Sequence, residues 1–404
     1  MLLYHILLRV LAAKELAARA AKADWSGIKA RLGRVDAAPE GATIWLHAAS
    51  NGEIASAKPV IRHLLDQGHR LLVTLNTDTG VALAKSWALP NLFAQLAPLD
   101  LPGPTRRIYR DWGITAHITL ESDLWPHRIL ACPGPVIVLG GRLTERSAKG
   151  WRRFPKLVGR VMKKITFLSA QDTGSMRRFE EFGLSDAAKG PVFDLKALYE
   201  PPDAPMNATL KSAFDRDTTW LAASTHEGDE DIVLEAHKRL LNVHPTARLI
   251  LAPRHPRRAD VIINLIRQHG LSFAQRSKGE NPETAQVYLA DTMGDMHLWY
   301  ALAGITLVAG SFSDRGGHTP YEPAHFRSAI LHGTDTANFE AAYEKLARLN
   351  GAICVDDAAS LADALESLMT SKTHTRLGAA AHDALLQDVK IDTLMQHVIA
   401  ALNA

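Results

Sequence analysis

Residues 291–323 read DTMGDMHLWYALAGITLVAGSFSDRGGHTPYEP and decide the fold. A turn with Gly294 precedes an apolar helix, a β-type run follows at 305–308, and a second glycine loop leads to Glu322, where another helix is expected to begin. Unpaired backbone N–H groups and the positive dipole end make a helix start a receptor for phosphate. A carboxylate at Glu322 suits the hydroxyls of a ribose instead. The stretch therefore predicts a nucleotide site at the carboxyl edge of a parallel sheet.

Short apolar runs typical of strands alternate with helical patterns along the rest of the chain. In the first half, the expected strands are 42–47, 70–74, 117–120 and 136–139, with a helix over 53–67. In the second half, the expected strands are 219–223, 248–252, 285–289 and 305–308, with helices over 231–243 and 258–269. Such alternation predicts an α/β fold in which helices cover both faces of parallel sheets.

The length of the chain predicts two domains. With 404 residues and an apolar fraction of 47%, the protein is too long for one ordinary core. Prolines concentrate at 199–205 (YEPPDAP), and proline cannot continue regular structure, so we place the interdomain linker there. The expected organisation is an N-terminal helix over 1–24 and two αβα domains over 25–200 and 207–404.

Charge and cysteine content exclude several classes of protein. A net charge of +3 with 6% aromatic residues argues against a nucleic-acid binder, which needs a strong basic excess and stacking residues. Cys132 and Cys354 are the two cysteines, and no Cys/His spacing of a zinc site is present. We expect a reducing compartment, no metal and no cofactor.

The first 24 residues form an apolar helical pattern with two interpretations. Arg9, Lys14 and Arg19 interrupt the run of about 18 apolar residues that a spanning helix needs, so no bilayer span is expected. The apolar positions that recur at helical spacing are Leu2, Leu3, Ile6, Leu7, Val10 and Leu11. This stripe fits a helix that lies in a membrane surface, and it equally fits a helix that packs on its own domain.

Carboxylates follow two of the expected strands in the first half. In HAASNGE, at 47–53, Glu53 would lie in the first turn of a helix, where it could act as a general base or simply complete a capping box with Ser50. In LESDLWPH, at 120–127, Glu121 and Asp123 could bind sugar hydroxyls or stabilise a cationic transition state, or Ser122 or Asp123 could be an N-cap. The residues alone leave both pairs of interpretations open.

Basic residues mark two further segments. In APRHPRR, at 252–258, Arg254 lies just beyond a strand, where a guanidinium can bind phosphate or carboxylate. Between Arg142 and Lys164 the chain is strongly basic, with Trp151 and Phe154 among the charges. That run is either a solvated face or a surface for an anionic membrane or a phosphorylated lipid.

Six motifs in this order resemble the 3-deoxy-D-manno-octulosonic acid (Kdo) transferases, and the resemblance covers nearly the whole chain. The family patterns are HAxSxGE at 47–53, an ETELWPN-like element at 121–127, ASTHxGE at 223–229, PRHPxR at 253–258, DTMGE at 291–295 and GGHNPLEP at 316–323. Ordered matches of this number are far more specific than any single motif.

The resemblance implies a GT-B glycosyltransferase with two Rossmann-like domains and an interdomain cleft. It implies inverting transfer of Kdo from CMP-Kdo to a lipid A precursor, a phosphorylated lipid, at the cytoplasmic face of the inner membrane. By position, Glu53 would be the proton acceptor and Glu121 a transition-state stabiliser. The implied CMP-Kdo contacts are Pro253, Arg254, Met293, Gly294, Asp295, Thr319, Pro320, Tyr321 and Glu322.

Several positions depart from the family pattern. Asn51 replaces a usual valine, His127 and Thr319 replace asparagines, and Tyr321 replaces a leucine. The family's GNLKFD segment reads GPVFDLK here, so its lysine is missing or displaced to Lys196. Two alternatives therefore stand beside the Kdo transferase: a GT-B enzyme with another activated sugar or acceptor, and a silent paralogue that only binds nucleotide.

Overall fold

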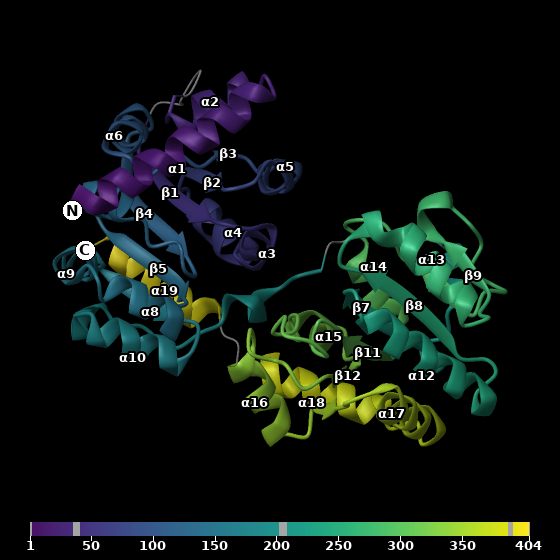
Figure 1. The fold of residues 1–404 in the computed structure, drawn as a ribbon. Helices are drawn as coiled ribbons and strands as arrows, with labels where there is room; N and C mark the ends of the chain where they lie inside the picture. The colour runs from purple at the N-terminus through teal and green to yellow at the C-terminus, as the bar shows by residue number, and fades with distance from the viewer. Residues whose placement is uncertain (1, 35–40, 202–207, 387–390, 404) are drawn as a thin grey trace. The chain divides into compact units, whose positions relative to one another are not determined.

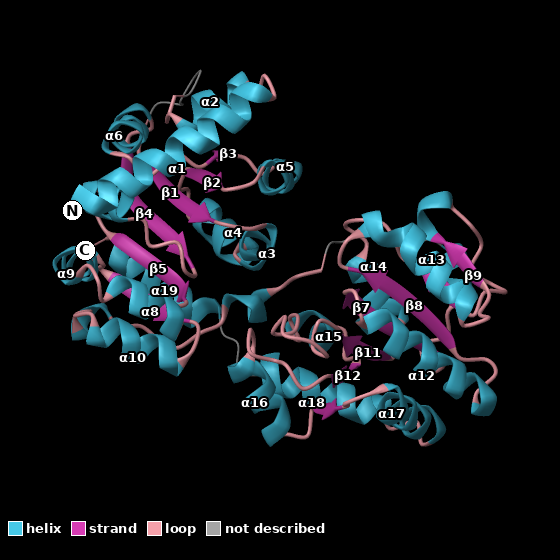
Figure 2. Ribbon diagram, viewed as in Figure 1, coloured by secondary structure: helices cyan, strands magenta, loops and turns pink. Residues whose placement is uncertain are grey.

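A computed structural model describes residues 2–34, 41–201, 208–386 and 391–403, with the side chains of 2–7 left out. The chain forms two compact units, Met1–Glu200 with Lys390–Ala404, and Pro201–Val389. Each unit is a parallel sheet between helices (Figures 1 and 2). The expected linker 199–205 spans the boundary between the units, and its residues 202–205 lie outside the described part.

The sheet of the first unit has six parallel strands in the order β3-β2-β1-β4-β5-β6. The strands are β1 (Thr43–Ala48), β2 (Leu71–Leu75), β3 (Leu92–Leu96), β4 (Ile114–Leu120), β5 (Val136–Gly141) and β6 (Phe167–Ala170). All six residues of β1 are buried, as expected for a central strand with helices on both faces. The strand order reverses between β1 and β4, and ligands of such sheets bind at the carboxyl edge beside this switch point.

Helices cover both faces of this sheet. They are α3 (Asn51–Ser56), α4 (Lys58–Asp66), α5 (Asp78–Ser86), α6 (Pro102–Asp111), α7 (Pro126–Ala131), α8 (Glu145–Trp151), α9 (Pro155–Lys164) and α10 (Thr173–Glu181). The single helix expected over 53–67 is wrong in detail, because α3 ends at Ser56 and α4 begins again at Lys58. Pro59 stands in the first turn of α4, where its missing N–H costs no hydrogen bond.

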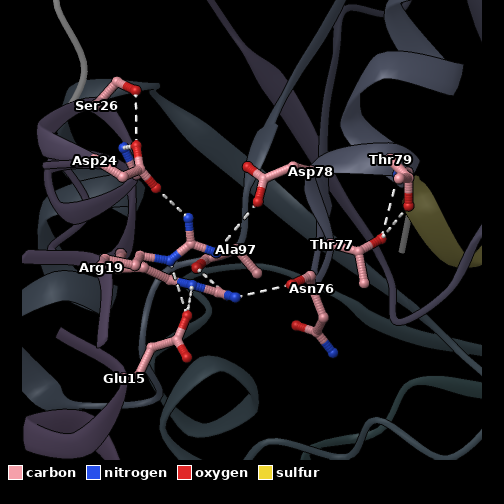
Figure 3. Close-up of polar contacts among 12 residues, drawn as sticks. Glu15, Arg19, Asp24, Ser26, Asn76, Thr77, Asp78, Thr79 and Ala97 are labelled. Carbon is pink, nitrogen blue, oxygen red and sulfur yellow. Dashed lines mark hydrogen bonds and ion pairs between the residues drawn. The ribbon is translucent and has the colours of Figure 1, made fainter. Parts of the chain in front are cut away.

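The N-terminal helix α1 (Leu2–Ala21) is tied to this unit by ion pairs (Figure 3). Glu15 accepts hydrogen bonds from Nε of Arg19 at 2.9 Å and from Nε of Arg31, in α2 (Trp25–Arg31), at 3.1 Å. Arg31 also donates to the carbonyl oxygens of Asn76 at 2.8 Å and Ala97 at 3.0 Å. The interpretation that α1 packs on its own domain is therefore confirmed for this end of the helix.

The apolar stripe expected on α1 divides between two environments. Leu8 and Ala12 are buried, whereas Val10 and Leu11 are exposed by 61% and 52%. The side chains of Leu2, Leu3, Ile6 and Leu7 lie outside the described residues. No helix in the described part of the chain is long and apolar enough to cross a bilayer.

The sheet of the second unit has seven parallel strands in the order β13-β12-β11-β7-β8-β10-β9. They are β7 (Thr219–Thr225), β8 (Arg248–Pro253), β9 (Phe273–Gln275), β10 (Val287–Leu289), β11 (Ile305–Val308), β12 (Ala329–His332) and β13 (Ala352–Cys354). The helices are α11 (Ala208–Ala213), α12 (Asp229–Val243), α13 (Ala259–Gln268), α14 (Met296–Leu302), α15 (Tyr321–His325), α16 (Glu340–Arg348), α17 (Ala358–Thr370) and α18 (His374–Leu386). Here the order reverses between β7 and β11.

The C-terminal helix α19 (Ile391–Leu402) differs from the expected domain boundary. It packs against α4 and β6 of the first unit, where Leu394, Met395 and Val398 are buried. The ring of His397 stacks on Phe167 of β6 with centroids 5.8 Å apart. Figure 1 shows this yellow helix among the elements of the first unit. The second domain expected over 207–404 therefore loses its last helix to the first unit.

Candidate active site

Glu53 lies at the switch point of the first sheet, in the first turn of α3. Ser50 is the N-cap: its Oγ accepts the N–H of Glu53 at 3.3 Å and donates to Oε1 of Glu53 at 3.2 Å. The backbone N–H of Ala49 donates to Oε2 at 2.8 Å. Ser50 is thus confirmed as the N-cap, whereas the expected capping box is not formed, because Glu53 accepts the N–H of Ala49 and not that of Ser50. This cap does not compete with a catalytic role. The cap holds both carboxylate oxygens in place.

The pKa of Glu53 is raised to about 7. Burial is the main cause, and the negative charge of Glu121 adds to it, while the hydrogen bond from Ala49 works in the opposite direction. A group with such a pKa exchanges a proton readily near neutral pH, which is the requirement for a general base.

Glu121 follows β4, the strand next to β1, and has a strained backbone. Its φ is 47°, a left-handed conformation that is uncommon for a residue with a side chain and is enriched at functional sites. The N–H of Glu121 donates to the carbonyl of Leu139 at 3.0 Å, and its carbonyl accepts from the N–H of Arg142 at 3.2 Å. Contacts to the end of β5 therefore stabilise the strained residue.

Lys196 forms an ion pair with Glu121. It comes from a short 3-10 helix, Leu195–Leu198, that packs against α3. Both side chains are largely buried, with 18% of Lys196 and 12% of Glu121 exposed. The structure therefore brings Lys196 into the site of Glu53 and Glu121, although the departure of GPVFDLK from the family pattern left its place open.

His47 and Asp123 form a second polar contact beneath this site. Nε2 of His47 lies 2.9 Å from Oδ2 of Asp123, and Nδ2 of Asn76 donates to the same oxygen at 3.0 Å. Burial is the main cause that lowers the pKa of His47 to about 4, so its ring is neutral at pH 7. The N-cap role considered for Ser122 or Asp123 is wrong: the N-cap of α7 is Trp125, and the carboxylate of Asp123 holds the imidazole.

Pro253 and Arg254 lie at the carboxyl end of β8 in the second unit. The N–H of Arg254 donates to the carbonyl of Thr225, at the end of β7, at 2.9 Å. The side chain of Arg254 is exposed. Among the described residues its guanidinium takes part in no ion pair, so its charge is available to a ligand.

The turn 291–295 follows β10 and presents an apolar side chain to solvent. Met293 is 72% exposed, and Gly294 has a φ of 93° that favours glycine. Oδ2 of Asp295 accepts from Oγ1 of Thr292 at 2.7 Å and from Nε of Arg276 at 3.1 Å. These two hydrogen bonds hold the turn in place without involving the side chain of Met293, which stays exposed to solvent.

Residues 319–322 follow the loop after β11. Pro320 is the N-cap of α15, Tyr321 is buried, and the N–H of Tyr321 donates to Oγ1 of Thr319 at 3.4 Å. Burial raises the pKa of Glu322 to about 7. No hydrogen bond to its carboxylate occurs within the described ranges, which fits an acceptor reserved for ligand hydroxyls. All nine expected nucleotide contacts thus lie at the end of β8 or in the segments that follow β8, β10 and β11, at one edge of this sheet.

Comparison with known proteins finds relatives that match this chain over most of its length. The profile of a family described as 3-Deoxy-D-manno-octulosonic-acid transferase (kdotransferase) matches residues 26–197. The 3-deoxy-D-manno-octulosonic acid transferase of Haemophilus influenzae is 32% identical over 361 residues, which cover 87% of this chain and 84% of the relative. This chain belongs to the Kdo transferase family. A probable mitochondrial member from Arabidopsis thaliana is 29% identical and covers 86% of this chain and 82% of its own length.

This chain has the GT-B fold. A crystal structure of a glycosyltransferase from Rickettsia africae matches with a TM-score of 0.59, 11% identity and coverage of 90% of this chain and 98% of that one. At this identity the likeness shows the fold alone. Together with the family, it makes the protein a glycosyltransferase and confirms the expected two parallel α/β domains.

Several residues of the site had no predicted role. His47 stood inside a quoted motif, but the strand pattern could not show that its ring meets Asp123. Arg276 lies in no motif, and only the folded chain brings it to Asp295. Within the described ranges no group of three or more His, Cys, Asp and Glu side chains is arranged to hold a metal ion.

Proposed function

We propose that this transferase moves Kdo from CMP-Kdo to a phosphorylated lipid acceptor, a lipid A precursor, with inversion at the anomeric carbon. The observation that carries the proposal is the arrangement of Glu53 beside the Glu121–Lys196 ion pair, with the pKa of Glu53 near 7. An acceptor hydroxyl needs a base of this kind as it attacks, because its proton must leave while the new bond forms.

The proposed step is a single displacement. Oxygen of the acceptor hydroxyl bonds to the anomeric carbon, and Glu53 takes the hydroxyl proton. The bond from that carbon to the phosphate oxygen breaks, and its electron pair leaves with CMP. The carboxylate of Glu121 stabilises the positive charge on the sugar, and Lys196 holds that carboxylate in place.

The expected contacts of the second unit have complementary chemistry for the parts of CMP. The free guanidinium of Arg254 suits the phosphate, exposed Met293 suits the face of the cytosine, and Glu322 suits the ribose hydroxyls. The remaining proposed contacts shape the loops around these three: Pro253, Gly294, Asp295, Thr319, Pro320 and Tyr321.

The first unit offers two surfaces for peripheral contact with the cytoplasmic face of the inner membrane. On α1 and α2, the exposed apolar side chains are Val10, Leu11 and Trp25. Along α8 and α9, the exposed basic side chains are Arg146, Lys149, Arg152, Arg153, Lys156, Arg160 and Lys163. The apolar side of α9 packs into the core, so its outward face offers charge to anionic headgroups and phosphorylated lipid, and no apolar stripe.

Release of CMP from CMP-Kdo, measured with a lipid A precursor as acceptor, tests the proposal. We expect turnover by the wild type and a loss of at least about a hundredfold in kcat for Glu53→Gln. Glu344→Gln, an exposed glutamate of α16, is the matched control and should match the wild type. Thermal stabilisation by uridine nucleotides and not by CMP would favour another activated sugar. CMP binding without turnover would favour a silent paralogue.

A further inference from the structure

Three histidines meet at the switch point of the second sheet and have no part in the proposed reaction. His226 follows β7, His255 follows β8, and His318 lies in the loop after β11. Nε2 of His226 lies 3.0 Å from Nε2 of His318, and the two rings are parallel within 3°. The ring of His255 meets that of His226 edge-on, with centroids 5.8 Å apart.

Buried contacts hold the two loops of this pair together. Oδ2 of Asp229, in the first turn of α12, accepts the N–H of His226 at 2.9 Å and the N–H of Gly310 at 2.9 Å. Gly310 has a φ of 69°, and a Cβ there would lie 3.0 Å from Cδ2 of His318 and 3.3 Å from Cδ2 of His226. The packing of the two imidazoles therefore depends on a glycine at this position.

The surroundings of the pair are positively charged. Arg315 is the strongest charge acting on His226, followed by Asp229, whose carboxylate is already occupied by two backbone N–H groups. Arg254 acts on His226 and His318. Arg257 and Arg258 are further positive groups that act on His255, and Arg258 is paired with Glu230. Arg254 and Arg315 are exposed and take part in no ion pair among the described residues.

The distance between the two rings limits how many protons they carry. At 3.0 Å one Nε2 must donate and the other accept, so the pair shares one hydrogen there. Two imidazolium rings would direct two N–H groups at each other, so the pair can take up one further proton and no more. Burial first, and then neighbouring positive groups, lower the pKa of His318 to about 4 and shift His226 in the same direction. An anion bound beside the two histidines and the arginines would counteract the effect of these positive neighbours and raise the two pKa values.

We propose that His226, His318 and Arg315 form a subsite for an anionic oxygen group of the ligand, and that filling it brings one proton onto the histidine pair. The subsite rests on the proposed function, in which the donor carries two such groups: the carboxylate of the sugar acid and the phosphate of the cytidylate. Both groups have the chemistry that imidazolium and guanidinium recognise.

Calorimetric titration of the purified full chain from pH 5.5 to 8 tests the subsite. The probes are the free sugar acid Kdo, cytidine 5′-methyl phosphate, whose diester keeps one charge over this range, and uncharged cytidine. Buffers of different ionisation heat reveal proton uptake. We expect the anion that fills the subsite to bind about tenfold more weakly at pH 7.5 than at pH 6, with uptake of up to one proton. Cytidine should bind equally at each pH.

Variants separate the subsite from the rest of the protein. His226→Gln and His318→Gln should lose the pH dependence and about tenfold of the affinity at pH 6, and change little at pH 8. Arg315→Gln, at an exposed position, should weaken the same anion without disturbing the fold. His382→Gln, in α18 beside Asp383, is the matched control and should bind as the wild type does.

Two results would overturn the subsite: wild-type binding of both anions that does not vary with pH and is unchanged in the three variants, or no binding of either anion. The transferase assay is independent of this test. Turnover with pH-independent anion binding would remove the subsite alone, whereas pH-dependent anion binding without turnover would remove the proposed reaction alone.

Discussion

Nε2 of His47 lies 2.9 Å from Oδ2 of Asp123, and this contact joins β1, the strand that leads to the helix of Glu53, to the loop after β4, which carries Glu121. Nδ1 of His47 lies 2.9 Å from Oγ1 of Thr74, which accepts Nε1–H of Trp45 at 2.8 Å. In the neutral ring, Nε2 donates to Asp123 and Nδ1 accepts from the hydroxyl of Thr74, whereas the carbonyl oxygen of Thr74, also 2.9 Å from Nδ1, receives no hydrogen from it. Strands β1, β2 and the loop after β4 are thus joined by one buried chain of hydrogen bonds.

Replacing Asp123 by asparagine should destabilise the first unit. Burial alone would raise the pKa of Asp123, but the hydrogen bond from His47, the positive charge of Arg128 and, below about pH 4, that of protonated His47 lower it to about 2. The carboxylate therefore contributes stability above its unfolded pKa near 3.8, which is lost as the pH falls through about 2. For Asp123→Asn we expect a loss of about 1–3 kcal/mol in the free energy of unfolding at pH 7, measured with urea.

Asp383→Asn, an exposed residue of α18, is the control for that measurement and should leave the stability unchanged. A fall in kcat of Asp123→Asn with an unchanged KM would show that the contact also positions Glu121. Equal stability of Asp123→Asn and the wild type at pH 7 would contradict the role given to the carboxylate.

Glu53→Gln should stabilise the protein while it removes activity. The folded pKa of Glu53, about 7, lies above the value of 4.5 in an unfolded chain, so the unfolded state loses its proton first as the pH rises. Stability therefore falls between about pH 4.5 and 7 in the wild type and not in the variant. Because the side chain is partly exposed, we expect a gain of about 1–2 kcal/mol at pH 8.

The same group predicts the pH dependence of the reaction. In the wild type, kcat/KM should rise with pH and level off above about 7, as the free Glu53 loses its proton. A profile that is flat from pH 5.5 to 8 would argue that another residue takes the proton. Glu344→Gln should keep both the wild-type profile and the wild-type stability.

The sequence predicted the elements around the site better than the assembly of its side chains. The strand expected over 305–308 is observed with the same bounds, because a run of β-branched and apolar residues between glycines has few alternatives. The strands β3, β6, β9, β12 and β13 were not predicted. Four of them, β6, β9, β12 and β13, have three or four residues and contain alanine, glutamine or histidine, which weakens the pattern.

Long-range contacts were beyond the reach of local patterns. Lys196 meets Glu121 across 75 positions, and the sequence indicated only that a lysine was missing or displaced. The apolar stripe of α19 is typical of a helix that packs against a domain, but a stripe of Leu, Met and Val fits the surface of either unit. The stripe alone therefore does not indicate that the last residues of the chain belong to the first unit.

Lys196→Met should move the pH profile as well as lower the rate. Without the ammonium group, the carboxylates of Glu121 and Glu53 repel each other more strongly, because Glu121 already raises the pKa of Glu53. We expect kcat/KM to fall about a hundredfold and its apparent pKa to rise. Lys196→Arg keeps a positive charge and should restore much of the rate. An unchanged profile in Lys196→Met would show that the ion pair is only structural.

Glu15→Gln should loosen α1 from the first unit. The carboxylate is paired with Arg19 and with Arg31, and its removal takes from the buried guanidinium of Arg31 the acidic group with which it forms its ion pair. Loss of such a partner costs about 1–3 kcal/mol. Faster hydrogen exchange in α1 and α2 would report it. Exchange in α12, in the other unit, is the internal reference and should not change.

The two proposed membrane surfaces differ in how they respond to salt. The basic face of α9 offers charge alone, because Leu157, Val158 and Val161 pack into the core. Each basic residue near an anionic surface contributes about 1 kcal/mol, and this attraction is screened within a Debye length. The triple variant Lys156→Gln, Arg160→Gln, Lys163→Gln should therefore bind phosphatidylglycerol vesicles about a hundredfold more weakly at low salt, with little difference at 0.5 M salt.

The apolar positions of α1 and α2 should behave in the opposite way. Leu11 and Trp25 would contribute by leaving water, which salt does not weaken, so the variant Leu11→Ser, Trp25→Ser should lose binding equally at low and high salt. Val243→Ser, an exposed apolar residue of α12, is the matched control. If the triple basic variant loses all binding at every salt concentration and the apolar variant loses none, the N-terminal helices do not enter the membrane surface.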